Sequence, residues 1–110
     1  MTTGRLGDLD DPDYPAYTTG RAAEVLGVQQ AFLRSLDTAG AVSPERTRGG
    51  RRRYTRRQLD FAARIRELFD QGHTLAAALR ILALEDELTA ERALSARLRT
   101  RLADQGPPGP

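Results

Sequence analysis

Residues 46–57 form the run RTRGGRRRYTRR, which holds seven of the chain's seventeen basic residues and no acidic residue. All seven are arginine, whose planar guanidinium group can bind a phosphate through two hydrogen bonds. Two adjacent glycines, Gly49 and Gly50, divide the run, and glycine accepts the positive φ angle that tight hairpin turns need. A solvated charged loop is the alternative interpretation. The turn signal favours a β-hairpin that presents arginine to phosphate.

The formal net charge of +2 hides an uneven distribution along the chain. Residues 1–15 carry one arginine and four aspartates, and residues 16–75 carry eleven arginines and six acidic residues. Residues 76–110 carry five basic and five acidic residues. A basic segment with an acidic and a neutral segment on either side is typical of nucleic-acid-binding proteins.

The composition excludes several other classes of function. The 110 residues contain no cysteine and one histidine, His73, so disulfides and thiolate metal sites are excluded and no other metal site is expected. No paired carboxylates and no nucleophile beside a base are apparent, so we expect no enzymatic activity, no cofactor and no small-molecule ligand. No apolar run approaches the ~18 residues that cross a bilayer, and the N-terminus does not resemble a signal peptide. We therefore expect a protein without membrane contact, in the cytoplasm at the nucleoid.

Two short helices are predicted before the arginine run. Thr18 and Thr19 are candidates for the N-cap of the first helix, and Gly27 ends it. The second helix is expected from Val28 to about residue 39, just before Gly40. This pattern is typical of a helix-turn-helix, in which the second helix can enter the DNA major groove. An ordinary corner between two helices remains the alternative.

The arginine run itself is predicted to contain two short strands. Residues 41–43 and 52–54 can pair around the glycine turn, with Pro44 ending the first strand. Thr55 then caps a long helix from residue 56 to about residue 71, because apolar residues recur there at spacings of three and four. Thr74 caps a further helix from residue 75 to about residue 84. Helix, turn, helix, hairpin and two helices is the order of a winged helix-turn-helix.

A last, separate helix is predicted from Thr89, after a solvated turn at residues 85–87. Its apolar residues form a single stripe, and an isolated helix of ~15 residues with one such stripe is not stable in water. Either it packs on its own domain or it pairs with the same helix of a second copy, and we favour an antiparallel homodimer. The residues expected at that interface are Leu88, Leu94, Leu98 and Leu102.

The expected fold is therefore mainly α, a winged helix-turn-helix domain over residues 16–86 with a small β-hairpin wing. A short C-terminal helix follows at residues 87–104 and is assigned to dimerisation. The acidic arm of residues 1–15 and the Pro/Gly tail of residues 105–110 are expected to be disordered. The arm is either a passive tail or a segment that competes with DNA for the basic face.

Four stretches of the sequence resemble the DNA-binding domain of the MerR family of bacterial transcriptional regulators. They are YTTGRAAEVLGV (17–28), FLRSLDTAGAVSPERT (32–47), GGRRRYT (49–55) and LFDQGHTLAAALRIL (68–82). They occur in the family's order and spacing, from residue 17 to about residue 86. The segments VSPERT (42–47) and GGRRRYT (49–55) are most similar to the branch of the family that includes repressors of heat-shock genes.

The resemblance implies a sequence-specific transcriptional regulator without a ligand-binding effector domain, bound as a homodimer to double-stranded DNA at a promoter or operator. It places the recognition helix, residues 28–39, in the major groove and the arginine-rich wing, residues 46–54, on the phosphate backbone. Glutamine can pair with adenine there, and phenylalanine can contact a thymine methyl group. The DNA-contacting positions that it implies are Thr19, Gln29, Gln30, Phe32, Arg34, Arg48, Arg51, Arg52, Arg53 and Tyr54.

The sequence departs from the family pattern in the recognition helix. Ser35 and Leu36 stand where two tyrosines are usual, and Ala31 stands where a basic residue is common. These departures support an alternative function, a protein-interaction module that binds a protein partner through the leucine stripe while its DNA binding is weak or lost. A two-fold dimer would predict an inverted-repeat operator, whereas monomers would predict direct repeats.

Overall fold

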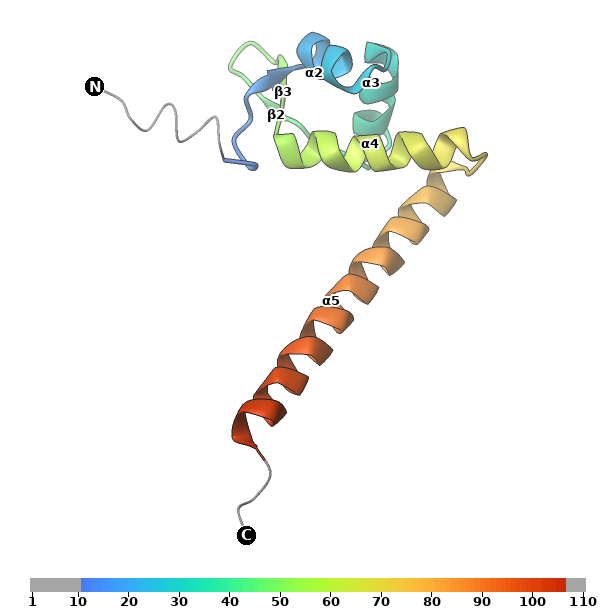
Figure 1. Cartoon of the computed structure of the whole chain (residues 1–110). Helices are drawn as coiled ribbons and strands as arrows, with labels where there is room; N and C mark the ends of the chain where they lie inside the picture. The colour runs from blue at the N-terminus through green and yellow to red at the C-terminus, as the bar shows by residue number, and fades with distance from the viewer. Residues whose placement is uncertain (1–10, 107–110) are drawn as a thin grey trace, which may run out of the picture.

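The computed structural model describes residues 11–106. Along the chain it contains β1 (Tyr17–Thr18), α2 (Thr19–Leu26), α3 (Gln30–Thr38), β2 (Glu45–Arg46), β3 (Arg52–Tyr54), α4 (Arg56–Asp70) and α5 (Leu75–Gln105). The first three helices and the small sheet form one compact unit, and α5 extends from it as a long rod (Figure 1). The expected winged helix-turn-helix order is confirmed. Most of the predicted acidic arm, residues 1–10, and most of the predicted tail, residues 107–110, lie outside the described residues.

The helix-turn-helix is formed by α2, α3 and the turn between them. Thr18 is the N-cap of α2, because its hydroxyl accepts a hydrogen bond from the Arg21 amide at 3.1 Å. Gly27, at a φ of 67°, ends α2 in the left-handed conformation. The Val28 amide then donates to the Ala23 carbonyl at 3.0 Å, so Val28 closes α2. For that reason α3 begins at Gln30. The start at Val28 that was predicted from the sequence is two residues too early.

The wing differs from the prediction in its first strand. The strand that pairs with β3 is Glu45–Arg46, after Pro44, and residues 41–43 are not a strand. The Ala41 and Val42 amides both donate to the Leu36 carbonyl, at 2.9 and 3.3 Å, so this segment completes the end of α3. Pro44 lies before the strand, where its missing N–H removes no ladder bond.

A third strand, which was not predicted, completes the sheet. β1 pairs antiparallel with β3 on the side opposite to β2, giving the order β1-β3-β2. The hairpin turn itself was predicted correctly. The Gly50 amide donates to the Thr47 carbonyl at 2.9 Å, and Gly50 has the positive φ, 81°.

The helix α4 crosses beneath α2 and α3 and carries much of the core. Thr55 is its N-cap and forms a capping box with Gln58, since each side chain bonds the other residue's backbone amide. The core is small and consists of leucine, alanine, isoleucine, valine and one tyrosine, Tyr54. Its buried residues are Ala22, Ala23, Leu33, Leu36, Val42, Tyr54, Leu59, Ala62, Ile65, Ala78 and Leu82.

The chain after residue 75 forms one helix where two were predicted. α5 runs without a break from Leu75 to Gln105, and Thr74, not Thr89, is its N-cap. Residues 85–87 are helical because no glycine or proline interrupts this stretch. Glu85 and Asp86 also form ion pairs with Arg64 of α4, whose Nη2 atom lies 3.3 Å from Glu85 Oε1 and 3.2 Å from Asp86 Oδ1. The predicted dimerisation helix is therefore the distal half of α5. No helix within residues 11–106 is long and apolar enough to cross a membrane.

Candidate nucleic-acid interface

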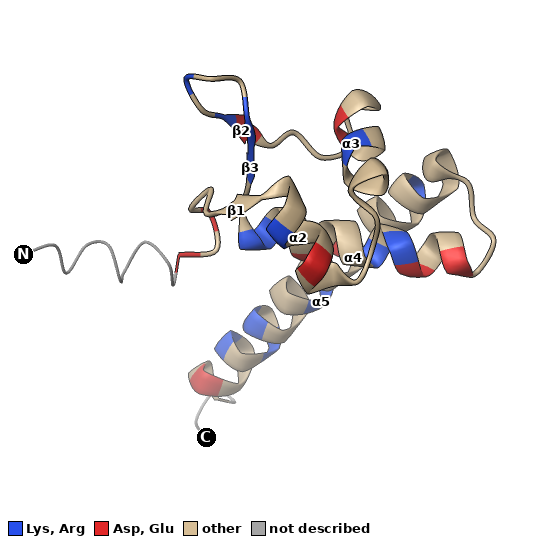
Figure 2. Cartoon of the chain, turned by 90° about the horizontal axis from the view of Figure 1, so that it is seen from above, with Lys and Arg blue, Asp and Glu red and all other residues tan. Residues whose placement is uncertain are grey.

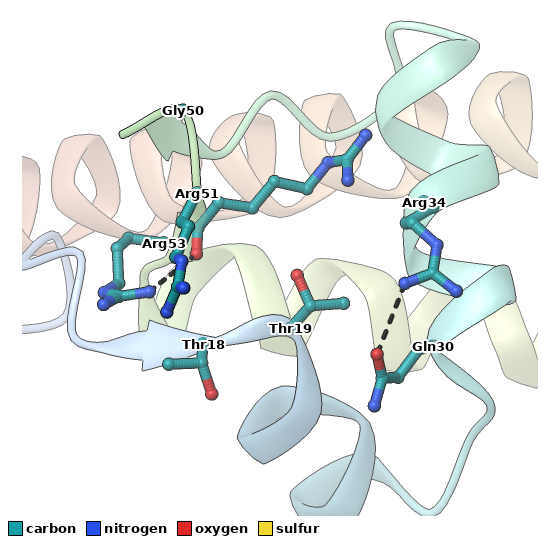
Figure 3. Close-up of a pocket in the computed structure, with 8 residues that line it drawn as sticks. Thr18, Thr19, Gln30, Arg34, Gly50, Arg51 and Arg53 are labelled. Atoms are coloured by element: carbon teal, nitrogen blue, oxygen red, sulfur yellow. Dashed lines mark hydrogen bonds between the residues drawn. The ribbon is translucent and has the colours of Figure 1, made fainter. Parts of the chain in front are cut away.

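A hollow of about 410 Å³ lies between the helix-turn-helix and the wing. Its walls come from the start of α2, from α3 and from β3 with the adjoining turn (Figure 3). The lining residues are Thr18, Thr19, Gln30, Arg34, Gly50, Arg51, Arg52 and Arg53. Six of these were predicted as DNA-contacting residues from the sequence. Four arginines and the N-terminus of a helix around one hollow form a site suited to an anion.

The side of α3 that lines the hollow is polar and exposed. Arg34 Nη1 donates to Gln30 Oε1 at 3.3 Å, which orients the two side chains along the same face (Figure 3). Gln29 is exposed at the N-cap of α3 and has no side-chain capping bond. These residues leave amide and guanidinium donors free to reach a ligand in front of α3.

Phe32, which was predicted to contact bases, is not among the residues that line the hollow. Its ring packs edge-to-face against Phe69 of α4, with 5.8 Å between the ring centroids. The guanidinium carbon of Arg66 lies 5.7 Å from the centroid of the same ring. Phe32 therefore fixes α3 against α4 and does not point toward the hollow.

Tyr54 is also turned inward and was wrongly predicted as a DNA contact. It is fully buried, at 0% exposure, beneath α2. Burial raises the pKa of its hydroxyl, and the neighbouring Thr19 side chain opposes the rise. Among the described residues, none lies within hydrogen-bonding distance and angle of the Tyr54 hydroxyl. An aromatic residue that closes the wing strand thus serves the core.

The wing is tied to α3 by Asp37. Its Oδ2 atom accepts from Arg52 Nε at 2.6 Å and from Arg46 Nη2 at 3.0 Å. Arg46 also donates to the Gly50 carbonyl at 3.0 Å, inside the hairpin. We call Asp37, Arg46 and Arg52 the wing clamp. The clamp joins the recognition helix to both hairpin strands. Because Arg52 forms an ion pair with Asp37, it is less able to bind a phosphate.

The other wing arginines divide into exposed and half-buried side chains. Arg48 and Arg51 are exposed, whereas Arg53 is half-buried and donates to the Arg52 carbonyl at 3.2 Å. Arg51 lines the hollow together with Arg34 of α3 (Figure 3). Basic residues also follow the wing as it projects from the body (Figure 2). Arg51 and Arg48 are thus the wing arginines best placed to meet a polyanion.

Sequence reasoning missed the clamp and two residues of the hollow, Thr18 and Gly50. Asp37 and Arg46 carry opposite charges, but they are nine residues apart, and no local sequence pattern predicts that they form an ion pair. Thr18 was recognised as a possible cap and not as part of the site. The four leucines assigned to dimerisation, Leu88, Leu94, Leu98 and Leu102, are all exposed on α5.

Comparison with known proteins agrees with this geometry. The model of the family described as MerR HTH family regulatory protein matches residues 17–85, which include both helices of the helix-turn-helix, the wing, α4 and the start of α5. The chain belongs to the MerR family. This confirms the resemblance seen in the sequence motifs.

Individual relatives support the same assignment. The chain is 36% identical over 91 residues to a putative heat shock protein HspR of Streptomyces coelicolor, a match that covers 82% of this chain and 60% of the relative. A MerR family transcriptional regulator from Bacillus cereus superposes with a TM-score of 0.56 at 22% identity, covering 80% of this chain and 72% of that one. HiNmlR, described as a MerR family regulator lacking the sensor domain and bound to promoter DNA, gives a TM-score of 0.58 at 24% identity, with coverages of 81% and 74%.

Proposed function

We propose that this MerR-family chain is a sequence-specific DNA-binding transcriptional regulator that acts in the cytoplasm as a homodimer. The observation that carries the proposal is the hollow between α3 and the wing, lined by Arg34 and by Arg51–Arg53. The promoter complex of the structural relative HiNmlR supports it. Gln29 and Gln30 at the start of α3 meet base edges in the major groove, and the exposed wing arginines meet the backbone.

The salt dependence of binding tests this assignment. Each phosphate contact that is lost lowers the slope of log affinity against log salt by about 1. Arg51→Ala is expected to lower that slope and to weaken binding to all duplexes alike. Arg80→Ala, an exposed arginine on α5, is the matched control and should leave the slope unchanged. Equal slopes for the two variants would refute the placement of the wing on phosphate.

Base readout by α3 needs a different measurement. Gln30→Ala is expected to cost roughly 1–3 kcal/mol on the preferred duplex and to relax the preference at one base pair. The duplex is obtained by selection from random oligonucleotides, and binding is then measured for each single-base variant. Thr38→Ala, on the last turn of α3, is the control. A uniform loss across all duplexes would show that Gln30 does not read a base.

The exposed face of α5 supports the homodimer. From residue 83 onward every side chain of α5 is exposed, so the helix does not pack back on its own domain. Five leucines on this part of the helix are 43–68% exposed and lie on one side, opposite to the buried Ala78 and Leu82, as follows from the turn of about 100° per residue. We call them the leucine stripe: Leu84, Leu88, Leu94, Leu98 and Leu102.

The spacing of the stripe fits an antiparallel pair of helices. Starting from Leu84, alternating steps of four and three residues reach Leu88, Glu91, Ser95, Leu98 and Leu102. Four of these six positions of a coiled-coil heptad pattern are leucine, and Leu94 lies beside the pattern. A two-fold axis beside Ala93 places Leu84 against Leu102 of the second copy and Leu88 against its Leu98. These four leucines are then covered in one register, and Glu91 lies opposite Ser95 of the second copy at the centre.

Charges beside the stripe agree with the same register. Glu85 and Glu87 flank the stripe near the domain, and Arg99 and Arg101 flank it near the C-terminus. Antiparallel pairing places Glu85 near Arg99 of the second copy and Glu87 near its Arg101.

Solution mass tests the dimer, by light scattering at micromolar concentration and by sedimentation for the dissociation constant. Burying the exposed half of a leucine contributes about 1 kcal/mol, and each substitution occurs twice per dimer. Leu98→Asp is therefore expected to raise the dissociation constant by at least about 30-fold. Ala90→Asp, which adds the same charge off the stripe, is the control. A monomeric parent would refute the interface and favour the alternative, a protein partner on the stripe.

The register has its own test by charge reversal. Glu87→Arg and Arg101→Glu should each weaken the dimer, because each places like charges together. The double variant should recover most of the affinity. Additive weakening in the double variant would show that the two residues do not meet, whether or not the chain dimerises.

A further inference from the structure

The hydroxyl group of Tyr54 is a buried polar group that packing alone does not explain. The residue is fully buried in the core, and its hydroxyl has no hydrogen-bond partner among the described residues. Buried polar groups in proteins nearly always have a partner, because an unpaired one costs free energy. A phenylalanine would fill the same space without that cost. The hydroxyl therefore indicates a role for Tyr54 beyond the packing of its ring.

The hydroxyl lies behind the hollow between α3 and the wing. Burial has the largest influence on its pKa and raises it, and the side chains that also act on this pKa are those of Thr19, Arg52, Asp37 and Arg34. Thr19, Arg52 and Arg34 line the hollow. Tyr54 does not line it, so an effect of its hydroxyl on a ligand in the hollow has to pass through one of these neighbours.

Thr19 is the neighbour that can transmit such an effect. It is the first residue of α2, and its half-buried side chain lines the hollow (Figure 3). The cap of α2 does not need the Thr19 hydroxyl, because Thr18 already accepts from the Arg21 amide at 3.1 Å. A threonine hydroxyl has one donor and two acceptor positions. Thr19 can therefore accept from Tyr54 and donate into the hollow at the same time.

We propose that Tyr54 is a positioning residue for the binding of a DNA phosphate by Thr19. The Tyr54 hydroxyl donates to Thr19 Oγ1, and the Thr19 hydroxyl donates to a phosphate oxygen of the DNA backbone. We call this pair of bonds the hydroxyl relay, and it rests on the proposed function. A threonine in a helix exchanges between two rotamers, and the bond from Tyr54 selects the one that aims at the phosphate. The free amides and the positive end of the dipole at the start of α2 favour an anion at the same place.

Hydroxyl deletions test the relay through the affinity for one duplex. Tyr54→Phe is expected to lower the affinity about 2- to 10-fold, the effect of one neutral hydrogen bond. Thr19→Val removes the phosphate contact itself and should lower the affinity at least about 10-fold. The double variant should bind as Thr19→Val does, because the two hydroxyls act in series. Thr19→Ser keeps the hydroxyl and should bind as the parent does.

Tyr17→Phe is the matched control. It removes a tyrosine hydroxyl from β1, opposite Tyr54 in the sheet, at a residue that does not line the hollow. Its affinity for the duplex should equal that of the parent.

Two further measurements separate positioning from a structural role. Tyr54 and Thr19 are uncharged, so their variants should bind more weakly with the same slope of log affinity against log salt. Because the buried hydroxyl is unpaired in the free chain, Tyr54→Phe should not lower the Tm measured without DNA. A displaced wing would instead change the slope and lower the Tm.

Several results would overturn the relay while leaving DNA binding intact. One is equal affinity of Tyr54→Phe and the parent, and another is losses that add in the double variant. A lower Tm or a changed slope in Tyr54→Phe would assign its effect to packing and would also overturn the relay. A parent chain that binds no duplex would refute the proposed function itself, and the relay with it.

Discussion

Replacing Asp37 by asparagine tests whether the wing clamp sets the geometry of the interface. Asparagine keeps the shape and an acceptor oxygen but removes the charge that holds Arg46 and Arg52. The Asp37 side chain is 18% exposed and Arg52 is 24% exposed, so this pair is better shielded than a surface ion pair. The Arg46 side chain is 49% exposed and contributes less.

The magnitude follows from the two bonds. A hydrogen bond to a charged group contributes about 1.5–3 kcal/mol and a neutral one about 0.5–1.5 kcal/mol. Exposed pairs fall to about 0–1 kcal/mol. We expect Asp37→Asn to lower the free energy of unfolding by about 1–2 kcal/mol, which for a domain of this size lowers Tm by roughly 5–10 °C.

DNA binding should respond in the opposite direction at low salt. Removal of the acid leaves two arginines unneutralised beside the hollow, so nonspecific affinity rises and its salt dependence steepens. Discrimination between duplexes should fall, because the wing is no longer fixed to α3. Circular dichroism melting and a fluorescence binding titration measure the two effects on the same samples.

Asp60→Asn is the matched control, because Asp60 is an exposed acid on α4 outside the hollow. It removes the same charge without touching the wing. If Asp37→Asn and Asp60→Asn have the same Tm and the same affinity for DNA, the clamp does not position the wing. A gain of affinity in both variants would show that only net charge matters.

Three further predictions concern the fold that carries the interface. Thr55→Ala removes the α4 capping box and should cost about 1 kcal/mol in chemical denaturation, and an unchanged midpoint would contradict that role. Leu33→Ala empties a fully buried position and should cost about 2–5 kcal/mol in the same assay, whereas a loss below 1 kcal/mol would show a loosely packed core. Arg57→Gln should raise the titration midpoint of Asp13, followed by nuclear magnetic resonance, because that arginine lowers the pKa. Since the folded pKa is depressed, the stabilisation from this pair is present above the ordinary carboxyl pKa and is lost as the pH falls through the folded pKa. A midpoint that does not move would refute the pairing.

Local signals predicted the helices that begin at a cap and end at a glycine. Thr55 and Gly27 mark such ends within a few neighbouring residues, and the structure has both where the sequence put them. The strands were harder, because two-residue strands carry no alternating pattern and depend on partners far along the chain. β1 was missed for this reason, and the partner of β3 was placed before Pro44 and not after it.

The site was predictable in its charge and not in the direction of each side chain. The arginine run indicates an anion-binding surface whatever the fold. Whether Arg52 meets a phosphate or Asp37 depends on the approach of α3 to the wing, which is a tertiary contact. Phe32 and Tyr54 were assigned to DNA because their positions match the family pattern, but this chain uses both rings for packing.

The length of α5 acts as a ruler in the proposed dimer. From Leu82, the last buried residue of the helix, to the two-fold axis at Ala93 is eleven residues, or about 16 Å, so the two domains are separated by about 33 Å along the helix pair. That distance is close to one turn of DNA, about 34–36 Å. Inserting one heptad before the axis in each copy would preserve the phase of the stripe and add about 21 Å, or roughly six base pairs. Six base pairs exceed half a turn of the duplex, so the two recognition helices would then face opposite sides of the DNA.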